Sequence, residues 1–599
     1  MTTLPWPQCT DDSDCQGARW AEYERCLRHL TEHERAAALS ALSEGSAVDL
    51  RGVSIDADLL EQLLSAVSRT LGEARFDHAS FPDGAAFDET TFNTDAVFAD
   101  AQFIGDAAFA DCHFIGEAIF TQVLFGVGAV FEDAQFDASA WFNDALFGGD
   151  ALFDGIEIAG LGMFQRTAFQ GDVTLNSAVF TGQGNFGEME VAGAAEFRKV
   201  RFGDESSFWA VELASDATFD DACFVGAWRG PIVCGGLLSM RRTTLNAPAR
   251  LDIAARQVDL SGAEFKATAV LQLRYAQVDM TDAVLSQPVT LVTRLSPIAV
   301  GGRPFQAENR FAGLGPVIKL HGIVGVDASH LILCDVDLTN CEVLGAYHLD
   351  QLRLEGYCRW AEPPRGLRRG PLWLPLWRWT RRKTMTEEHR WRARSAIKFR
   401  RDGWTADAAG RRGELTAEPH DLAAVYRQLR KALEDRKDEP GAADFYYGEM
   451  EMRRHSARVP RGERVLLHLY WLVSGYGLRA SRALTALIVA MTATVVLMMA
   501  WGLPTQTSST EVLPTSAVSA QPSTWTIRKT DPLLNEPMSA RWTAQRARDA
   551  VQVVINSVLF RSSGQDLTPI GTWIEMFSRL TEPTLLGLAA LATRSRVKR

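Results

Sequence analysis

Phenylalanine recurs along the first third of the chain with a regular alternation of steps. The stretch FADAQFIGDAAFADCHFIGEAIF, residues 98–120, places Phe at positions 98, 103, 109, 114 and 120, so steps of five and six residues alternate. Two interleaved series with a period of 11 residues run from Phe76 to Phe219 and from Phe81 to Phe224, and 24 of their 28 positions are Phe. The other four positions are also apolar: Ile158, Leu175, Val191 and Leu213.

This pattern predicts short strands that coil, not a helix. A step of five residues rotates a helix by about 140°, which would place successive Phe on different faces. Many of the Phe are preceded by Ala two positions earlier, and residues two apart in an extended chain face the same side. Each unit therefore has a small and a large side chain inside, followed by a polar corner. These alanines are Ala79, Ala85, Ala96, Ala101, Ala107, Ala118, Ala129, Ala134, Ala140 and Ala145.

The pattern resembles the pentapeptide-repeat family, in which a central Leu or Phe points inward with a small residue two positions earlier. The resemblance implies a mainly β fold, a right-handed quadrilateral β-helix, over residues 71–354. The alternating six-residue step departs from the family, and faces of five, six, five and six residues would make a 22-residue coil. A later stretch, with Leu251, Leu271 and Leu291, has a 20-residue period, and residues 294–326 interrupt it. Stacking of the coils buries the apolar ladder.

Charge is unevenly distributed along the chain. Residues 72–225 contain 27 Asp and Glu against 5 Lys and Arg, whereas residues 351–480 contain 17 acidic against 28 basic residues. The first region repels nucleic acid and anionic lipid, and the second attracts them. Nine scattered cysteines and no N-terminal apolar leader indicate a reducing cytosol for most of the protein.

The N-terminal segment, residues 1–70, carries candidate metal ligands. Cys9, Cys15, Cys26 and His29 have the spacing C-x5-C-x10-C-x2-H. Three thiolates and one imidazole can complete a tetrahedral structural zinc site, with His33 as an alternative to His29. Reduced cysteines on a small helical cap are the other interpretation. In both cases residues 31–70 are predicted to form helices that shield the first Phe layer.

A basic, Trp-rich linker is predicted over residues 355–418. Residues 353–401 contain 15 Lys and Arg, 4 Glu and five Trp. This composition suits anionic lipid headgroups, although nucleic acid or a solvated loop against the acidic rod would also accommodate it. Glu387 and Glu388 are interpreted as ordinary helix-surface residues. A helical hairpin is predicted for residues 419–480.

Residues 481–599 are predicted to form a membrane module with two spans, near 484–503 and 572–593. The first is an uninterrupted uncharged run that is long enough to cross the hydrocarbon. The second would bring Glu575, Arg579 and Glu582 into the membrane, which requires that they pair or face protein or water. Arginines before the first span and basic residues at the C-terminus predict that both termini are cytoplasmic.

The order of span, outer loop, short amphipathic helix, Gly-containing turn and second span is similar to the two-helix potassium-channel pore. The turn Ser563, Gly564, Gln565 and Asp566 resembles the end of the selectivity-filter motif. Ser562 and Gln565 interrupt the carbonyl ladder that replaces potassium hydration, so the pore would be degenerate. A plain two-helix anchor is the alternative.

The features together favour a non-enzymatic membrane protein. A cytoplasmic β-helix, tethered to the membrane, would present its acidic rod to a protein partner. The C-terminal module could in addition act like an ion channel, and the protein would then form a homo-oligomer. The alternative, which follows from the pentapeptide-repeat resemblance, is a nucleic-acid-mimicking inhibitor of a DNA-binding enzyme such as a topoisomerase. The acidic charge makes binding of nucleic acid itself unfavourable. No catalytic triad, phosphate-binding loop or pair of catalytic acids is evident.

Overall fold

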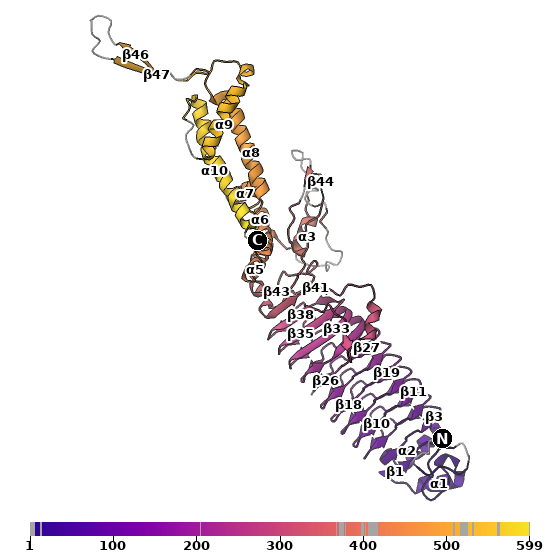
Figure 1. Ribbon diagram of the computed structural model, residues 1–599. Helices are drawn as coiled ribbons and strands as arrows, with labels where there is room; N and C mark the ends of the chain where they lie inside the picture. The colour runs from indigo at the N-terminus through magenta and orange to yellow at the C-terminus, as the bar shows by residue number, and fades with distance from the viewer. Residues whose placement is uncertain are drawn as a thin grey trace. The chain divides into compact units, whose positions relative to one another are not determined.

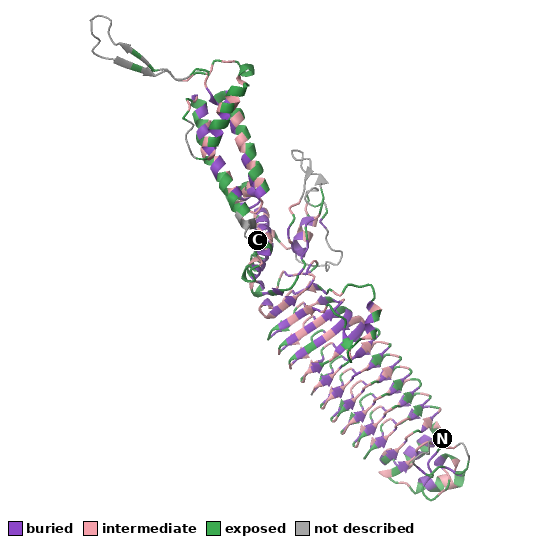
Figure 2. Ribbon diagram, viewed as in Figure 1, coloured by how far each residue is buried: buried purple, intermediate pink, exposed green. Residues whose placement is uncertain are grey.

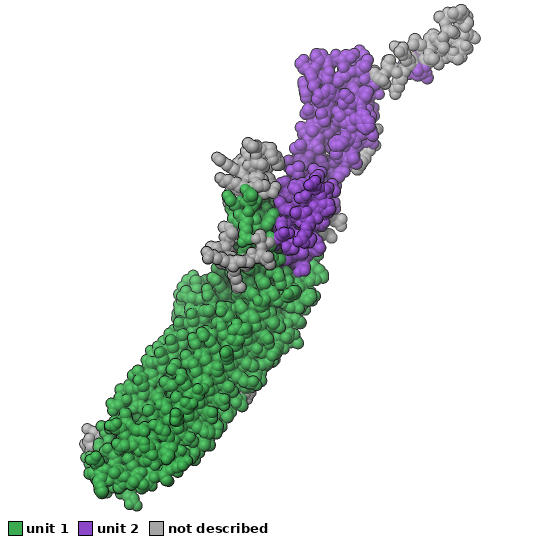
Figure 3. Space-filling view, turned by 180° about the vertical axis from the view of Figure 1, so that it is seen from behind, with its two compact units in different colours: residues 1–417, 431–436 green, residues 418–430, 437–599 purple. Residues whose placement is uncertain are grey.

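The computed structural model describes residues 6–11, 15–203, 205–366, 368–369, 376–377, 379–396, 401, 403–404, 417–506, 510–514, 525–529, 532–559 and 564–597. The chain forms two compact units (Figure 3). Unit 1 comprises residues 1–417 and 431–436, and unit 2 comprises residues 418–430 and 437–599. Unit 1 is mainly β, and unit 2 is mainly helical.

Unit 1 is a parallel β-solenoid of about 14 turns (Figure 1). A regular turn of its first half contains four strands of two residues, such as β5 (Thr91–Phe92), β6 (Ala96–Val97), β7 (Gln102–Phe103) and β8 (Ala107–Ala108). A strand pairs in parallel with the equivalent strand one turn later. In one such ladder Ala96 of β6 pairs with Ala118, and Ala118 pairs with Ala140.

The Phe side chains point into the solenoid and form columns along it. Phe98, Phe120 and Phe142 are fully buried in one column, with successive ring centroids 4.9 Å apart and nearly parallel planes. Rings of neighbouring columns meet edge to face, as Phe98 and Phe109 do at 5.6 Å and 86°. Both arrangements are favourable for aromatic pairs. Figure 2 shows the resulting alternation of buried and more exposed positions around each turn.

Tight turns recur at regular intervals along the solenoid, and one residue in each adopts a left-handed conformation. In the turn from Phe98 to Ala101, the N–H of Ala101 donates to the carbonyl of Phe98 and Asp100 has φ 58°. A positive φ at the third residue is what a type II turn requires, and Asp and Asn tolerate it better than most residues. The equivalent residues are His78, Glu89, Asp111, Gln122, Asp133, Asp144, Gly155, Arg166, Ser177, Glu188, Lys199, Ala210 and Asp221.

Polar side chains at the corners accept backbone N–H groups of the next turn. Asp95, Asp106 and Asp150 each place Oδ1 2.9 to 3.1 Å from an amide nitrogen 22 residues later. The backbone bends away from the strand ladder at these places, and its N–H groups need other acceptors. Many of the acidic residues of the solenoid therefore have a structural role. The same contact is made by Asp88, Ser139, Asn143, Asp154, Asp172 and Asn176.

The second half of the solenoid has longer strands, and a regular complete turn of the solenoid there contains fewer residues, 20 in place of 22. The strands β31 (Pro231–Ser239), β33 (Ala249–Asp259), β35 (Ala269–Arg274) and β38 (Val289–Thr293) pair one after another. In this ladder Leu251 pairs with Leu271 and Leu271 with Leu291, as the shorter period of these leucines predicts.

An irregular segment after β38 interrupts the solenoid. It contains β39 (Ala299–Val300), β40 (Arg303–Pro304) and the 3-10 helix η2 (Gln306–Phe311). Phe311 packs on the side of the solenoid, and the buried Glu308 pairs with Arg274 at 3.0 Å. The chain then resumes the solenoid with β41 (Lys319–Gly322), which pairs with β36 (Gln277–Asp279), and with β42 (Leu331–Cys334), which pairs with β38.

The N-terminal end of the solenoid is closed by helix and strand. Helix α1 (Glu32–Ser40) starts with a capping box between Thr31 and Glu34, and α2 (Ala57–Ala66) buries four leucines. Between them β1 (Ser46–Asp49) pairs in parallel with β2 (Thr70–Arg75). The helices predicted for residues 31–70 are present, but a strand that was not predicted lies between them and extends the ladder before the first Phe.

Unit 2 contains most of the remaining helices. Residues 419–480, predicted as a hairpin, form α5 (Pro419–Asp435), α6 (Glu439–His455) and a further helix, α7 (Arg461–Ser474). Pro460 before α7 and the left-handed Gly475 after it mark its ends. The rest of the unit comprises α8 (Ala480–Leu497), which continues as a π-helical turn at Met498–Gly502, the strands β46 (Thr510–Pro514) and β47 (Trp525–Lys529), α9 (Ala544–Val558) and α10 (Pro569–Val597).

Among the described residues, one helix, Ala480–Gly502, is long and apolar enough to cross a membrane. It contains nearly all of the first predicted span. The second, near 572–593, falls within α10, which carries Glu575, Arg579 and Glu582 and does not pass the same test.

The left-handed turn positions give a stability prediction. Gln122 is exposed with φ 60°, so Gln122→Gly relieves a conformational cost and should raise the free energy of unfolding by up to about 1 kcal/mol. Gln102→Gly, at an exposed strand position of the solenoid, should lower it by roughly 0.5–1 kcal/mol. Thermal unfolding of the full chain, followed by far-ultraviolet circular dichroism, measures both. Destabilisation by Gln122→Gly would contradict the role assigned to the turn.

Candidate functional site

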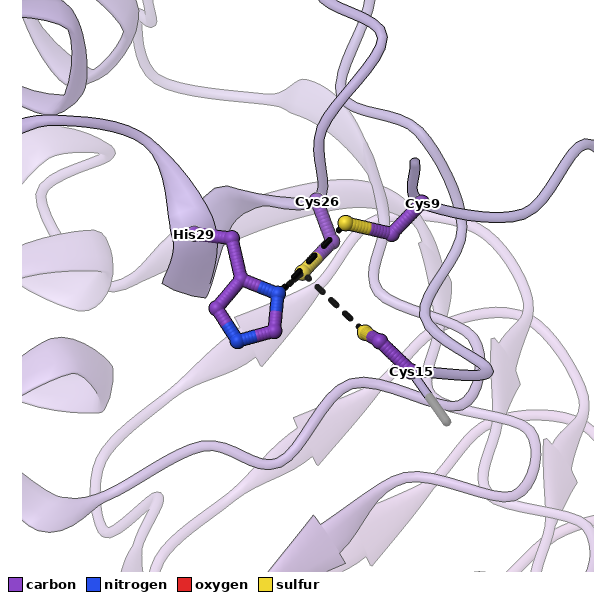
Figure 4. Close-up of side chains that lie close together, drawn as sticks. All are labelled: Cys9, Cys15, Cys26 and His29. Atoms are coloured by element: carbon purple, nitrogen blue, oxygen red, sulfur yellow. Dashed lines mark hydrogen bonds between the residues drawn. The ribbon is translucent and has the colours of Figure 1, made fainter. Parts of the chain in front are cut away.

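The four predicted metal ligands converge at the N-terminal end of unit 1 (Figure 4). Cys9 and Cys15 precede Ala18, Cys26 immediately precedes the one-turn 3-10 helix η1 (Leu27–His29), and His29 is its last residue. Their ligand atoms all lie within 4.8 Å of one another. The four residues that the sequence spacing selected thus lie together in the structure, and the cluster contains His29 and not the alternative His33.

The distances fit a tetrahedral metal site. His29 Nδ1 lies 3.4 Å from Cys9 Sγ and 3.6 Å from Cys26 Sγ, and Cys15 Sγ lies 3.8 Å from Cys26 Sγ. Bonds of about 2.3 Å to sulfur and about 2.0 Å to nitrogen around a tetrahedral centre place sulfur atoms about 3.8 Å apart and sulfur and nitrogen about 3.5 Å apart. All nine cysteines are free thiols, so no disulfide competes for these sulfur atoms.

Neighbouring groups affect both the acidity and the position of the thiols. Burial raises the pKa of Cys26 to about 12, whereas at Cys9 the effect of burial is outweighed by hydrogen bonds from the backbone and from His29, and its pKa falls to about 7. A Cβ added to Gly17 would lie 3.0 Å from the Cβ of Cys26, so glycine permits the close approach. The N–H of Cys9 donates to the carbonyl of Gly17.

The cluster joins the N-terminal loop to the start of the solenoid. The N–H of Ala18 donates to the carbonyl of Arg51, which lies between β1 and α2. Trp6 packs against the guanidinium of Arg51 at 5.0 Å and against the ring of His78. A metal bound here would stabilise this connection, as structural metal sites do.

The outer surface of the solenoid bears a high density of carboxylates. Some of these carboxylates accept hydrogen bonds from backbone N–H groups at the corners, as described above. Others project from the left-handed turns, such as Asp100, Asp111 and Asp133. Ion pairs with arginine neutralise a few, including Asp144 with Arg166 and Asp221 with Arg242. The surface remains acidic because residues 72–225 contain few basic residues.

Comparison with protein families bears on this unit. Residues 76–124 match the family model described as pentapeptide repeats (9 copies). The predicted β-helix is thus confirmed by both the match and the parallel solenoid, whose regular turns continue well beyond the matched residues. Comparison of the chain with curated proteins and with solved structures gave no match.

The basic segment after the repeats packs inward, in contrast to the prediction of an exposed helix surface. Glu388 is fully buried and pairs with Arg382 and Arg392, at 2.5 and 2.6 Å. Arg392 also lies over the rings of Trp379 and Trp404. The interpretation of Glu388 as a surface residue is wrong, because two buried arginines pair with its carboxylate and tryptophan rings cover one of them, Arg392.

Glu387, also assigned to the surface, closes the C-terminal end of the repeat solenoid. It lies in α3 (Thr386–Ala393), and its Oε1 accepts the N–H groups of Val343 and Leu344 at 2.7 and 2.9 Å. Burial raises the pKa of this carboxyl. The described part of the predicted lipid-binding linker therefore contributes arginine, tryptophan and glutamate side chains to a folded cap.

In unit 2, α8, α9 and α10 pack through small and polar residues and through an apolar cluster that includes Met498 and Val553. Gly502 and Gly571 allow the end of α8 and the start of α10 to approach until a Cβ on Gly571 would lie 2.3 Å from the carbonyl oxygen of Gly502. Thr568, before α10, donates its hydroxyl to the carbonyl of Trp501 at 2.6 Å. Arg546 of α9 donates to carbonyls at the end of α8, those of residues 499 and 503. Sequence reasoning did not assign roles to these residues.

Buried polar side chains of α10 face its neighbours. Glu582 is fully buried, and the Thr494 hydroxyl of α8 lies 2.9 Å from its Oε1. Ser578 donates to Ser557 of α9 at 2.9 Å, and Glu575 is also buried. The spacing of residues 575, 578 and 582 places all three on one helix face, which is a sequence signal for this arrangement.

The pore-like turn lies between α9 and α10. Gly564 is exposed with φ 66°, and Asp566 is also exposed. The amide of Gln565 donates to Gln552 Oε1 of α9 at 3.4 Å, so the turn contacts the helix that precedes it. Ser563 lies outside the described residues.

Proposed function

We propose that this protein is a non-enzymatic, membrane-anchored scaffold, held by α8 and α10 and presenting its acidic solenoid to a protein partner. The observation that carries the anchoring is the polarity of the helical bundle in unit 2. Glu575, Ser578 and Glu582 of α10 are buried, whereas large apolar side chains of the same helix are between 55% and 72% exposed. A water-soluble bundle has the opposite arrangement. The exposed side chains are Ile570, Trp573, Met576, Phe577 and Leu580.

Lipid as the surrounding solvent accounts for this polarity. Helices in membranes pack through small residues and interhelical hydrogen bonds, and their ionisable residues face the protein interior. Helix α8 conforms as well, with Ile488 and Val489 exposed and Ala483 and Thr494 buried. Two arginines just before the uncharged part of α8, and four basic residues between 594 and 599, favour cytoplasmic placement of both termini.

The acidic solenoid supports the scaffold role. Its repeating backbone is rigidly stacked, and its carboxylates offer a periodic negative surface to a basic protein partner. The same surface also supports mimicry of nucleic acid toward an enzyme such as a topoisomerase. Anchoring in a membrane favours the scaffold, because an inhibitor of a DNA-bound enzyme has to reach the DNA.

We expect the anchor to have two spans. A tag inserted after residue 520 should be accessible to antibody on intact cells, whereas tags at either terminus should become accessible only after permeabilisation. The protein should also remain in the membrane pellet after alkaline carbonate treatment. Accessibility of the C-terminal tag on intact cells would indicate a single span, and release by carbonate would contradict anchoring.

The Cys and His cluster is proposed to hold one structural zinc ion. Three sulfur atoms and one nitrogen at tetrahedral separations are a donor set that zinc prefers. When bound, zinc would stabilise the cap on the first solenoid turn, with no open position for chemistry.

Zinc analysis of the purified full chain tests this assignment. The expected content is one zinc per chain, falling to near zero in Cys26→Ser and in His29→Ala. Cys112→Ser is the matched control, since Cys112 is buried in the solenoid away from the cluster and should leave the zinc content unchanged. Zinc retained by both cluster variants would refute the site.

For unit 2 we also propose a more specific function, ion permeation. It is supported by the order of α8, the short α9, an exposed turn and α10, and by the contact between Gln565 and Gln552. Such a pore requires several copies around one axis, hence a homo-oligomer. The interrupted filter sequence argues against selectivity for potassium.

Flux through liposomes containing the purified full chain tests permeation. We expect ion flux that changes in Gln565→Ala and Asp566→Ala but not in Thr584→Ala, an exposed position elsewhere on α10. Absence of flux in all of them, with insertion verified, would leave the anchor and exclude the channel.

A further inference from the structure

Helix α7, which precedes the first proposed span, exposes a row of aliphatic side chains. Val465, Leu466, Leu469 and Leu472 are 52–67% exposed. Their spacing of one, three and three residues places them on a single face of the helix. A surface helix of a soluble protein normally turns such a face to the core.

The orientation of α7 is determined by the contacts of its opposite face. Leu467 is buried in a cluster with Tyr447 and Met450 of α6. Trp471 donates its indole N–H to the hydroxyl of Tyr447 at 3.0 Å, and Arg454 of α6 lies over the Trp471 ring at 4.3 Å. The aromatic side of α7 is thus engaged with α6, and the aliphatic side has no cover within the described residues of unit 2.

The turn after α7 reinforces this arrangement. Gly475, Tyr476 and Gly477 all have positive φ, between 55° and 74°, and carry the chain from α7 into α8. The Tyr476 side chain is buried, and its hydroxyl donates to Glu451 Oε2 of α6 at 3.1 Å. A buried tyrosine with a left-handed backbone is uncommon and requires support from its surroundings. These three residues therefore fix the junction of α6, α7 and α8.

The charge around α7 favours one kind of surface. Residues 453–482 contain seven Arg and one Glu, and Glu463 is paired with Arg453. A helix with an exposed apolar face, flanked by arginine and tryptophan, binds in the interface of anionic membranes. The proposed span α8 begins at Ala480, and only the short turn after Ser474 separates it from α7, so α7 lies near the level of the headgroups.

We propose that α7 lies in the plane of the membrane on the cytoplasmic side, with Val465, Leu466, Leu469 and Leu472 among the acyl chains of anionic lipids. This proposal rests on the anchoring by α8 proposed above. It assigns the lipid contact that composition suggested for residues 355–418 to a different segment. The buried contacts between α7 and α6 then hold α6 at the membrane surface.

Photo-crosslinking to lipid tests the proposal in the full chain. Benzoylphenylalanine replaces Leu469 on α7, Ile488 on the exposed side of α8, or Gln102 on the solenoid, each in a separate variant. The protein is reconstituted in vesicles of equal parts phosphatidylcholine and phosphatidylglycerol, or of phosphatidylcholine alone. We expect lipid adducts at positions 469 and 488 and none at 102. The adduct at 469, but not at 488, should fall several-fold without phosphatidylglycerol.

The outcomes separate the two proposals. An adduct at 488 without one at 469, or a crosslink from 469 to protein, overturns the position of α7 and leaves the span intact. No adduct at either position overturns the span and with it the position of α7. As a further check, Leu466→Glu with Leu472→Glu should abolish the adduct at 469 and preserve that at 488. These side chains are exposed, so the double variant keeps the packing of α7 on α6.

Discussion

The structure of unit 1 depends on the agreement of two distances. Neighbouring β-strands lie about 4.7–4.9 Å apart, and the stacked rings of the solenoid lie at nearly the same separation, 4.5 Å for Phe81 and Phe103 and 4.9 Å for Phe98 and Phe120. Backbone pairing and ring stacking therefore reinforce each other at every turn. A single turn offers neither, so the turns are stable only as a stack. Where the sequence replaces Phe by Ile or Leu, the stack continues, because any apolar side chain of similar size fills the space.

The acidic surface follows in part from the same stacking. Each turn has corners where the strand ladder ends, and the backbone N–H groups there require acceptors. Asp95 and Asp106 supply these acceptors to the next turn, and Asp100 occupies a left-handed position that Asp adopts more readily than most residues do. Aspartate is thus favoured at two kinds of position, the corners and the left-handed turns, for structural reasons that do not involve a partner. If the acidic surface binds a partner, the carboxylates available for that role are those that neither accept a corner N–H group nor pair with an arginine.

Periodic and local signals in the sequence predicted more than signals that depend on distant segments. The Phe series identified the solenoid, and the spacing of three cysteines and His29 identified a cluster whose atoms converge. Glu388 was misread because its partners Arg382 and Arg392, and the surrounding tryptophans, form a fold that has no periodicity. The strand β1 was missed because four residues give too short a pattern. Helix α7 has clear boundary residues, a proline before it and a glycine after it, and these would have identified it.

Helix α10, which we propose as the second span, shows why average hydropathy is a poor test for such a helix. The average counts Glu575 and Glu582 against a span even though both are buried within the bundle. The lipid would meet only the outward residues, which are large and apolar. What matters energetically is whether each buried polar group has a partner, since an unsatisfied group costs more in hydrocarbon than in water. On the inner face, the Thr494 hydroxyl donates to Glu582 Oε1 and Ser578 donates to Ser557, whereas Glu582 Oε2 has no hydrogen-bond partner among the described residues. Assigning a span therefore requires the two faces of the helix to be weighed separately.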